Sequence, residues 1–307
     1  MHRPVMLEES VAALNVRADS IIVDATLGGG GHSREILAAL GPRGVLIGLD
    51  QDPDAVQRIA ALPYGDDERL RLVHSNFRHI REVVENLGYS RVDGVIMDLG
   101  LSSYQIADAQ RGFSFQTAGP LDMRMDPGAD LTAEDIVNHY SEEDIARIIW
   151  ELGEERHSRR IASLIAGERR KNRISDTSHL ADIIVSAKPG RRGRINPATK
   201  TFMALRMAVN DEIGALKAAL SGSLELLAEN GRLVVISFHS LEDRVVKRFF
   251  RKHRGYEESL QGGGSRWRRA EPPVRLITRK PLLATENEVR ANPRARSAKM
   301  RVAERCS

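Results

Sequence analysis

Short apolar runs alternate with longer amphipathic stretches through the first hundred residues of the chain. The apolar runs predict strands at residues 21–24, 45–50, 71–74 and 94–98, and the stretches between them predict helices at 33–40, 54–62 and 80–87. Strands that are apolar along their whole length and alternate with helices are typical of a parallel sheet covered on both faces. The pattern therefore predicts a doubly wound α/β fold.

The pattern changes between residues 106 and 204, where loops rich in Gly, Pro and Asp are followed by helices crowded with charge. Thr132 and Ser141 each precede an acid by three residues, which is the capping-box signal for a helix start. The α/β pattern then resumes, with helices expected over 201–227, a strand at 231–238, a basic helix at 241–253 and short strands at 274–278 and 299–303. We expect a discontinuous domain, residues 1–105 and 205–307, interrupted by a smaller helical domain at 106–204.

Composition adds limits on the class of protein. Of 307 residues, 41% are hydrophobic and 29% charged, which is ordinary for a globular protein. No apolar run approaches the ~20 residues of a membrane span, and the first residues lack a secretory signal, so we expect a cytoplasmic protein without a membrane partner. The single cysteine, Cys306, lies in the polar C-terminal segment and is a poor candidate for the thiolate used in methylating carbon 5 of cytosine.

The charge balance points to nucleic acid. The formal net charge is +4 and the pI about 9.3. Arginines concentrate at 169–173 and again at Arg191, Arg192 and Arg194, and a second basic stretch carries an aromatic residue between its charges, Arg266-Trp267-Arg268. We predict that the last two stretches bind RNA, although solvated surface is the simpler reading of any one cluster.

A glycine-rich loop, TLGGGGH at residues 26–32, follows the first predicted strand, and Asp50 ends the second. Glycines let a ligand approach the backbone, and an acid about twenty residues further on is placed to accept hydrogen bonds from ribose hydroxyls. Ser33 takes the place of the third glycine of the dinucleotide motif, and the chain has no P-loop, so pyrophosphate binding and a dehydrogenase are disfavoured.

S-adenosylmethionine needs the same ribose acid but no phosphate cradle, and its sulfonium and amino groups favour acidic surroundings. Asp24, Asp50 and Asp98 would all stand at the carboxyl ends of strands, where open α/β sheets bind their ligands. Phe77, after the third strand, is placed to lie against adenine. The alternative is that the glycines form only a tight turn, that the acids cap helices and that Phe77 belongs to the core.

Motifs along nearly the whole chain resemble one family, the bacterial small-subunit (16S) ribosomal RNA cytosine-N4 methyltransferases. They are RPVMLEE at 3–9, TLGGGGH at 26–32, MDLGLSSYQ at 97–105, RGFSF at 111–115, GPLDMRMD at 119–126, NPATKTF at 196–202, VNDE at 209–212, SFHSLEDR at 237–244 and NPRARSAK at 292–299. The order and spacing of the motifs together make the resemblance specific.

The resemblance implies a Rossmann-like methyltransferase sheet with an inserted helical domain for substrate recognition. It also implies methyl transfer from S-adenosylmethionine to the exocyclic N4 amine of one cytidine in the decoding region of 16S rRNA, with the assembled small ribosomal subunit as the expected substrate. The cofactor contacts carry over onto Gly30, Gly31, His32, Asp50, Phe77, Asp98 and Gln105. The contact at Gln105 rests on the resemblance alone, and His32 is expected to line the pocket wall.

Asp98 is the candidate catalytic residue, as a carboxylate that accepts a hydrogen bond from the amine; the rival role is to hold the amino group of the cofactor's methionine end. Amino-methylating enzymes of DNA often have two prolines and an aromatic residue after this position, whereas here the run is DLGLS at 98–102. The stacking partner of the base is therefore open, with Tyr104, Phe113 and Phe115 as alternatives to their more usual packing roles.

Other functions stay open at this stage: a methyltransferase of DNA or protein with the same cofactor domain, and a non-enzymatic rRNA-binding assembly factor. No cluster of His and acidic residues has the spacing of a metal site, so no metal is expected. The sequence does not decide between a monomer and a homodimer.

Overall fold

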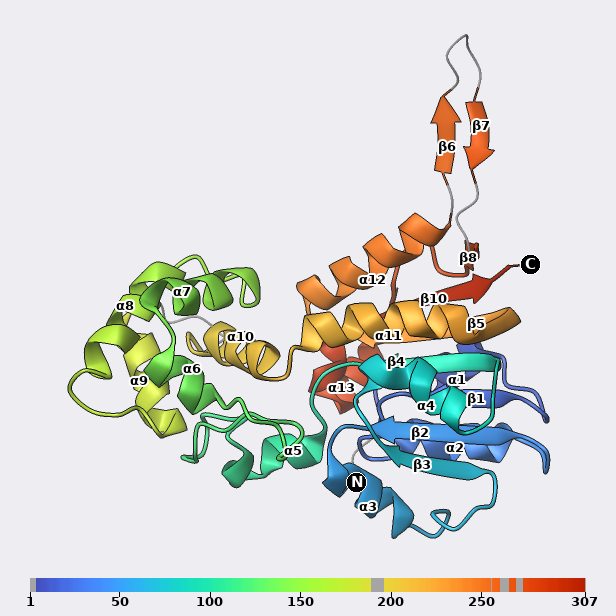
Figure 1. Ribbon diagram of the computed structural model, residues 1–307, viewed down its shortest axis with the longest axis horizontal. Coiled ribbons are helices and arrows are strands. Elements are labelled where there is room, and N and C mark those ends of the chain that lie inside the picture. The colour runs from blue at the N-terminus through green and yellow to red at the C-terminus, as the bar shows by residue number, and fades with distance from the viewer. Residues whose placement is uncertain (1–3, 189–195, 255, 260–264, 269–272, 307) are drawn as a thin grey trace. The chain divides into compact units, whose positions relative to one another are not determined.

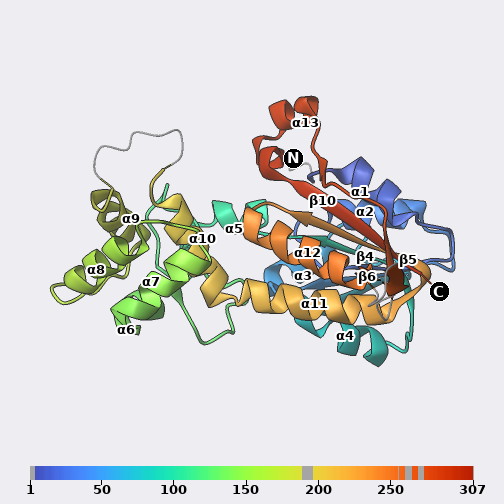
Figure 2. The same cartoon turned by 90° about the horizontal axis from the view of Figure 1, so that it is seen from above.

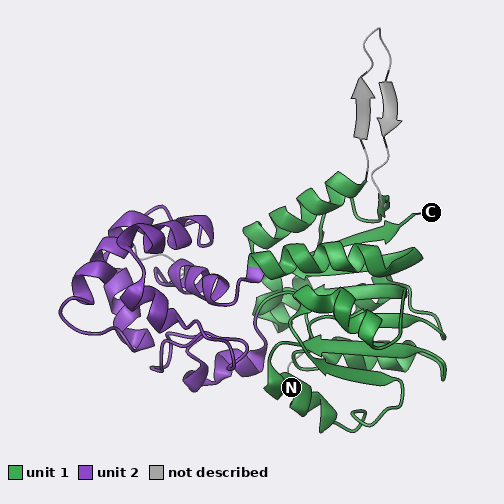
Figure 3. Ribbon diagram, in the orientation of Figure 1, with its two compact units in different colours: residues 1–100, 213–307 green, residues 101–212 purple. Residues whose placement is uncertain are grey.

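The computed structural model describes residues 4–188, 196–254, 256–259, 265–268 and 273–306, with only the backbone described at 256–259 and 265–268. The chain divides into two compact units (Figure 3): unit 1 comprises residues 1–100 and 213–307, and unit 2 comprises residues 101–212. The chain therefore leaves unit 1 once, after β4, and returns to it at the start of α11.

The described part of unit 1 contains an eight-stranded sheet in the order β3-β2-β1-β4-β5-β10-β8, with β9 also paired to β10 (Figure 1). The parallel strands are β1 (Ile21–Asp24), β2 (Val45–Asp50), β3 (Leu70–His74), β4 (Val92–Asp98) and β5 (Leu227–Ser237). The antiparallel edge consists of β10 (Lys299–Arg305), β8 (Val274–Leu276) and β9 (Leu282–Leu283). The predicted doubly wound α/β fold is confirmed.

Helices cover both faces of the sheet, and consecutive strand residues point to opposite faces (Figure 2). Ile22 packs with α1 (Leu7–Leu14), α2 (Gly31–Ala39) and α3 (Pro53–Ala60), whereas Val23 packs with α4 (Ile80–Asn86), α11 (Glu212–Leu226) and α12 (Ser240–His253). Both side chains are fully buried. The predicted strands therefore read as apolar runs because each of their faces is covered.

Five α-helices and strands of unit 1 are missing from the sequence prediction. They are α1, α13 (Glu286–Ala291), the edge strand β9 and the two strands of an antiparallel hairpin, β6 (Tyr256–Ser259) and β7 (Ser265–Arg268). In α1, the N-cap residue Met6 adopts a left-handed conformation and forms no side-chain capping hydrogen bond. This helix therefore begins without the polar signal that marks most helix starts in sequence.

Unit 2 is built from helices around its own hydrophobic core. Its helices are α5 (Ser103–Ala107), α6 (Ala133–His139), α7 (Glu142–Glu151), α8 (Ser158–Glu168), α9 (Thr177–Ser186) and α10 (Thr199–Val209). The predicted capping residues Thr132 and Ser141 accept hydrogen bonds from the backbone at the starts of α6 and α7, at 3.1 and 3.0 Å. Phe115 contacts Phe202 edge to face, with ring centres 4.9 Å apart, so Phe115 packs against the core.

A buried ion pair joins three segments of unit 2. Lys188 Nζ, just after α9, donates to Glu155 Oε2 at 2.6 Å and to the carbonyl oxygen of Pro197 at 2.7 Å. Glu155 Oε1 accepts from the backbone N–H of His157 at 2.9 Å. The two charged side chains are only 4% and 5% exposed. The pair therefore fixes the turn between α7 and α8 to the end of α9 and the start of α10.

Candidate active site

Three acidic residues end neighbouring parallel strands of unit 1. Asp24, Asp50 and Asp98 are the last residues of β1, β2 and β4. The register places Asp24 beside Gly48 on β2 and Ile96 on β4. The acids therefore lie along one edge of the sheet, the carboxyl edge at which α/β folds bind ligands.

Asp50 is held by the glycine loop. Its Oδ2 accepts from the backbone N–H of Gly28 and its Oδ1 from that of Asp52, both at 2.9 Å. Burial raises the pKa of Asp50 to about 6, with smaller contributions from the charges of Asp52 and Asp24, although the two backbone hydrogen bonds lower it. Each carboxylate oxygen still has acceptor capacity for a ligand hydroxyl.

Gly30 and Gly31 are glycines for reasons of packing as well as conformation. A Cβ on Gly30 would lie 2.3 Å from the Tyr64 hydroxyl and 2.4 Å from Ile59 Cδ1, and φ here is +74°. A Cβ on Gly31 would lie 2.0 Å from Pro4 Cγ. Any larger residue would displace the loop, so these two glycines are required by the protein itself, and their contact with a cofactor stays a prediction.

Asp24 and His32 lie beneath the loop and are both buried. Asp24 Oδ2 accepts from the Ser33 hydroxyl at 2.6 Å and Oδ1 from the backbone N–H of Thr26 at 3.2 Å. Burial raises the pKa of Asp24, which the charge of His32 partly offsets. His32 Nδ1 is 3.8 Å from Asp98 Oδ2, so the histidine lies close to the predicted catalytic acid, and its place in the wall of a cofactor pocket stays a prediction.

The backbone of Asp98 is held by a hydrogen bond, whereas one of its carboxylate oxygens accepts none from the described residues. Its N–H donates to Thr26 Oγ1 at 2.7 Å. Its Oδ1 is buried and has no hydrogen-bond partner among the described residues. Burial raises the pKa of Asp98 well above the usual value, and the negative charges of Asp24 and Glu242 add to the effect. A buried acceptor without a protein donor is costly unless a ligand donates to it, which makes Asp98 the strongest candidate for contact with a reacting group.

Glu242 is a site residue that the sequence analysis did not single out. It belongs to the first turn of α12 and is 3% exposed. Its Oε2 accepts from the backbone N–H groups of Phe238 and His239 at 2.9 and 3.3 Å, and its Oε1 is 3.0 Å from His239 Nε2. In sequence, an acid at this position reads as an ordinary helix cap. Its effect on Asp98 arises only because β5 lies beside β4 in the sheet.

The remaining predicted residues are less informative. Phe77 begins a short 3-10 helix (Phe77–His79) and is half-buried against the core, as its packing reading expects. Gln105 belongs to unit 2, where its Oε1 accepts from the N–H of Ser102 at 3.0 Å. The predicted RNA contacts Arg191, Arg192 and Arg194 lie outside the described residues, and Arg266, Trp267 and Arg268 lie on β7, where only the backbone is described.

Among the described residues, no group of three or more His, Cys, Asp and Glu side chains is arranged to hold a metal ion. Across the same ranges, no helix is both long and apolar enough to cross a bilayer.

The doubly wound sheet and the acid-lined carboxyl edge are typical of α/β proteins that bind nucleosides. Residues 1–306 match the sequence model of the MraW methylase family, and the chain belongs to that family. Curated relatives named "Ribosomal RNA small subunit methyltransferase H" are 47% identical in Heliobacterium mobile, 47% in Carboxydothermus hydrogenoformans and 48% in Geotalea uraniireducens. These matches cover 99%, 100% and 99% of this chain and 98% of each relative.

Membership of the family confirms the predicted enzyme class, a methyltransferase that depends on S-adenosylmethionine. S-adenosylmethionine contains no pyrophosphate, which agrees with the prediction made from the incomplete dinucleotide motif. The non-enzymatic alternative is wrong for this chain.

Proposed function

We propose that this protein transfers a methyl group from S-adenosylmethionine to the exocyclic N4 amine of a cytidine in the decoding region of 16S rRNA. The names of the relatives support the ribosomal RNA substrate. The single observation that supports an amine as the group that receives the methyl is the Oδ1 of Asp98 at the end of β4, which is buried and has no hydrogen-bond partner among the described residues. An amine donates a hydrogen bond to such an oxygen, whereas a ring carbon does not. We place the reaction in the cytoplasm, on rRNA in the assembled small subunit.

S-adenosylmethionine supplies an electrophilic methyl group on a sulfonium sulfur. The residues present fit such a cation, because the buried carboxyl groups of Asp24 and Glu242 both lie close enough to Asp98 to act on its charge at this edge of the sheet. Asp50 is proposed to hold the ribose hydroxyls. The other proposed cofactor contacts are those named from the sequence: Gly30, Gly31, His32, Phe77 and Gln105.

The protein's main task is positioning, because the cytosine amine is conjugated with its ring and is a weak nucleophile. A methyl group and an amine held in line gain several of the roughly 7–11 kcal/mol available from orientation. Asp98 accepts a hydrogen bond from the amine, which aims the nitrogen lone pair, and stabilises the positive charge that forms on nitrogen as the carbon–sulfur bond breaks. The amine then loses a proton, for which the Asp98 carboxylate is the nearest proposed acceptor.

Unit 2 is proposed to recognise the substrate. Arg191, Arg192 and Arg194 belong to its chain segment, and we propose that they and the Arg266-Trp267-Arg268 stretch contact RNA phosphates.

The proposed reaction is tested by incubating the protein with methyl-labelled S-adenosylmethionine and small subunits that lack the modification, followed by nuclease digestion and mass spectrometry. Label on the N4 of one cytidine is the expected result. Label on another atom, or on DNA or protein but not on rRNA, would refute the proposed substrate. Naked 16S rRNA serves as the comparison that tests the need for an assembled subunit.

Adenosine binding is expected to depend on pH through Asp50. Its pKa of about 6 means that the carboxylate becomes protonated below that pH and loses acceptor capacity for the ribose hydroxyls. Affinity should therefore be constant above about pH 7 and weaken by up to roughly tenfold per unit below pH 6. Calorimetric titration with adenosine isolates this group, because adenosine lacks the sulfonium centre and the methionine amino group for which the other acids are proposed.

The matched variant for this titration is Asp50→Asn. It should bind adenosine roughly tenfold or more weakly at pH 7, because a hydrogen bond to a charged group is lost, and its affinity should change little between pH 5 and 7. A wild-type affinity that is flat across this range would contradict the role of Asp50.

A further inference from the structure

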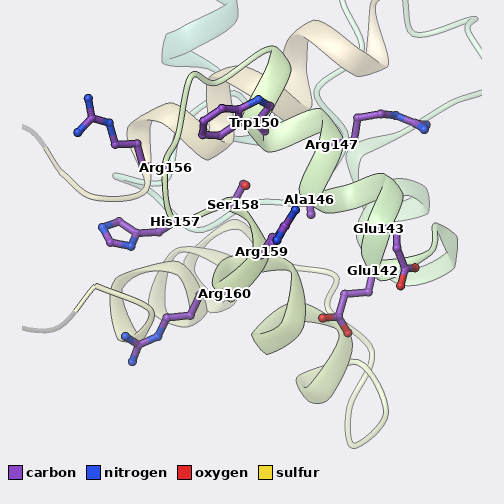
Figure 4. Close-up of a pocket in the computed structure, with 10 residues that line it drawn as sticks. All are labelled: Glu142, Glu143, Ala146, Arg147, Trp150, Arg156, His157, Ser158, Arg159 and Arg160. Carbon is purple, nitrogen blue, oxygen red and sulfur yellow. The ribbon is translucent and has the colours of Figure 1, made fainter.

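A pocket of about 900 Å³ lies in unit 2, where α7 and the start of α8 meet (Figure 4). In Figure 4, Glu142 and Glu143 lie on one side of the pocket and Arg156, His157 and Arg160 on the other, with Arg159 between them. The basic and aromatic lining residues are Arg147, Trp150, Arg156, His157, Arg159 and Arg160. The pocket lies entirely within unit 2 and involves none of the residues proposed to hold the cofactor.

Three of the four arginines that line this pocket form no ion pair within the part of the chain that the structure describes. Arg156, Arg159 and Arg160 are exposed and make no ion pair with any described residue, whereas Arg147 pairs with Asp144 at 2.6 Å. By contrast, in the cluster at 169–173, Arg173 pairs with Glu134 at 2.6 Å. Uncompensated guanidinium groups gathered around one concave surface favour an anionic ligand with several charges.

The position of these arginines on α8 strengthens this reading. The N-terminus of a helix carries partial positive charge and normally has acidic residues in its first turn. The first turn of α7 follows this rule, with three acids. The first turn of α8 has none and instead contains Arg159 and Arg160, and its N-cap residue His157 forms no side-chain capping hydrogen bond. An anion bound here would offset an arrangement that is otherwise unfavourable for the helix.

Trp150 supplies an aromatic surface at the same place. Its side chain is 57% exposed near the end of α7, although Ile145 and Ile149 of the same helix are fully buried. The ring is therefore not needed to fill the core. An exposed aromatic ring beside unpaired arginines is the combination with which proteins bind single strands of nucleic acid, by stacking a base and pairing with phosphates.

We propose that this pocket binds single-stranded RNA, with one base stacked on Trp150 and the flanking phosphates paired with Arg156, Arg159 and Arg160. The proposal rests on the proposed rRNA substrate and assigns unit 2 a contact on the strand next to the target. The buried pair Lys188–Glu155 holds this pocket in place, because Glu155 accepts a hydrogen bond from the backbone of His157, where α8 begins.

The test measures binding of a short fluorescein-labelled single-stranded RNA by anisotropy across a salt series. Trp150→Ala should weaken binding roughly tenfold, and Trp150→Phe should restore most of the loss, since a phenyl ring still stacks. In Arg159→Ala/Arg160→Ala, the slope of log affinity against log salt should fall by about 1.4, which is about 0.7 for each phosphate contact on a single strand.

Two control variants change the same chemistry elsewhere on unit 2. Arg170→Ala removes a charge that is exposed just beyond α8, and Val185→Ala removes an exposed apolar side chain of α9. Both should bind RNA as the wild type does. A direct readout compares the quenching of tryptophan fluorescence by RNA in the wild type and in Trp150→Phe, in which Trp267 is the one tryptophan left of two, so that the difference reports on Trp150.

The outcomes separate this proposal from the proposed function. Unchanged affinity and salt slope in the pocket variants overturn it, as does a loss of self-association in Trp150→Ala with RNA binding intact, because the ring would then be a protein contact. If the wild type transfers no methyl group to rRNA, the proposed function fails, but the oligonucleotide measurement still decides whether the pocket binds RNA.

Discussion

Asp98→Asn is expected to lower kcat for methyl transfer by about 10²–10⁴-fold, the range for loss of a positioned proton acceptor. The substitution keeps the size of the side chain and keeps the backbone hydrogen bond from Asp98 to Thr26. It removes the negative charge that stabilises the amine as nitrogen becomes positive. Single-turnover kinetics with undermethylated subunits measure the effect on the chemical step separately from product release.

Binding measurements on the same variant distinguish the two roles of Asp98. If it acts on the substrate amine, S-adenosylmethionine and RNA should bind Asp98→Asn with nearly wild-type affinity. If it holds the methionine amine instead, S-adenosylmethionine should bind more weakly while adenosine binding is unchanged. Turnover close to that of the wild type would remove Asp98 from the mechanism altogether.

The same residue gives the reaction a pH dependence with a definite sign. Burial, Asp24 and Glu242 raise the pKa of Asp98, so the active carboxylate form becomes more abundant as pH rises. kcat/KM for the wild type should therefore increase with pH through that pKa. Glu242→Gln retains an oxygen to accept from Phe238 but removes a negative charge, so the rising limb should move to lower pH.

The parallel strands were predictable because the apolar pattern that marks each of them lies within a short stretch of sequence. Residues 21–24 and 45–50 were predicted as strands with the bounds that the structure has, since runs buried on both faces contain few polar residues. The hairpin β6–β7 was missed because its strands, YEES and SRWR, lack an apolar face to reveal them. α5, with five residues, is too short to show helical periodicity.

The acids of the site were predictable from the order of strands, but their electrostatics were not. The pKa of Asp98 is raised by the charge of Glu242, which is 144 positions later in the sequence. The two residues come near each other only because β4 and β5 pair. The arginine run at 169–173 shows in the same way that charge in the sequence does not by itself identify a binding surface. Arg169, in that run, donates to the carbonyl oxygen of Val137 and so serves the fold, whereas Arg156, Arg159 and Arg160 form a shorter run that the sequence analysis passed over and that makes no ion pair with any described residue.

The second large effect concerns stability. Lys188→Met is expected to lower the free energy of unfolding of unit 2 by about 3–5 kcal/mol, because it leaves the Glu155 carboxylate buried without its cationic partner. Burial acts to raise the pKa of Glu155, but the hydrogen bonds from Lys188 and from the backbone of His157, together with the lysine charges nearby, lower it, so the native carboxylate is charged at neutral pH. Urea denaturation of a Trp267→Phe variant with and without Lys188→Met measures the loss of unfolding free energy, since Trp150 fluorescence then reports on unit 2 alone.

A surface pair provides the matched control. Lys171 Nζ lies 3.1 Å from Glu168, but the lysine side chain is 71% exposed, so Lys171→Met should cost less than about 1 kcal/mol. The double variant Glu155→Gln/Lys188→Met should regain most of the loss, because no unpaired charge stays buried. Equal effects at Lys188 and Lys171 would show that water reaches Glu155. In that case the start of α8, and with it the arginine-lined pocket, would be held by its apolar contacts rather than by the ion pair.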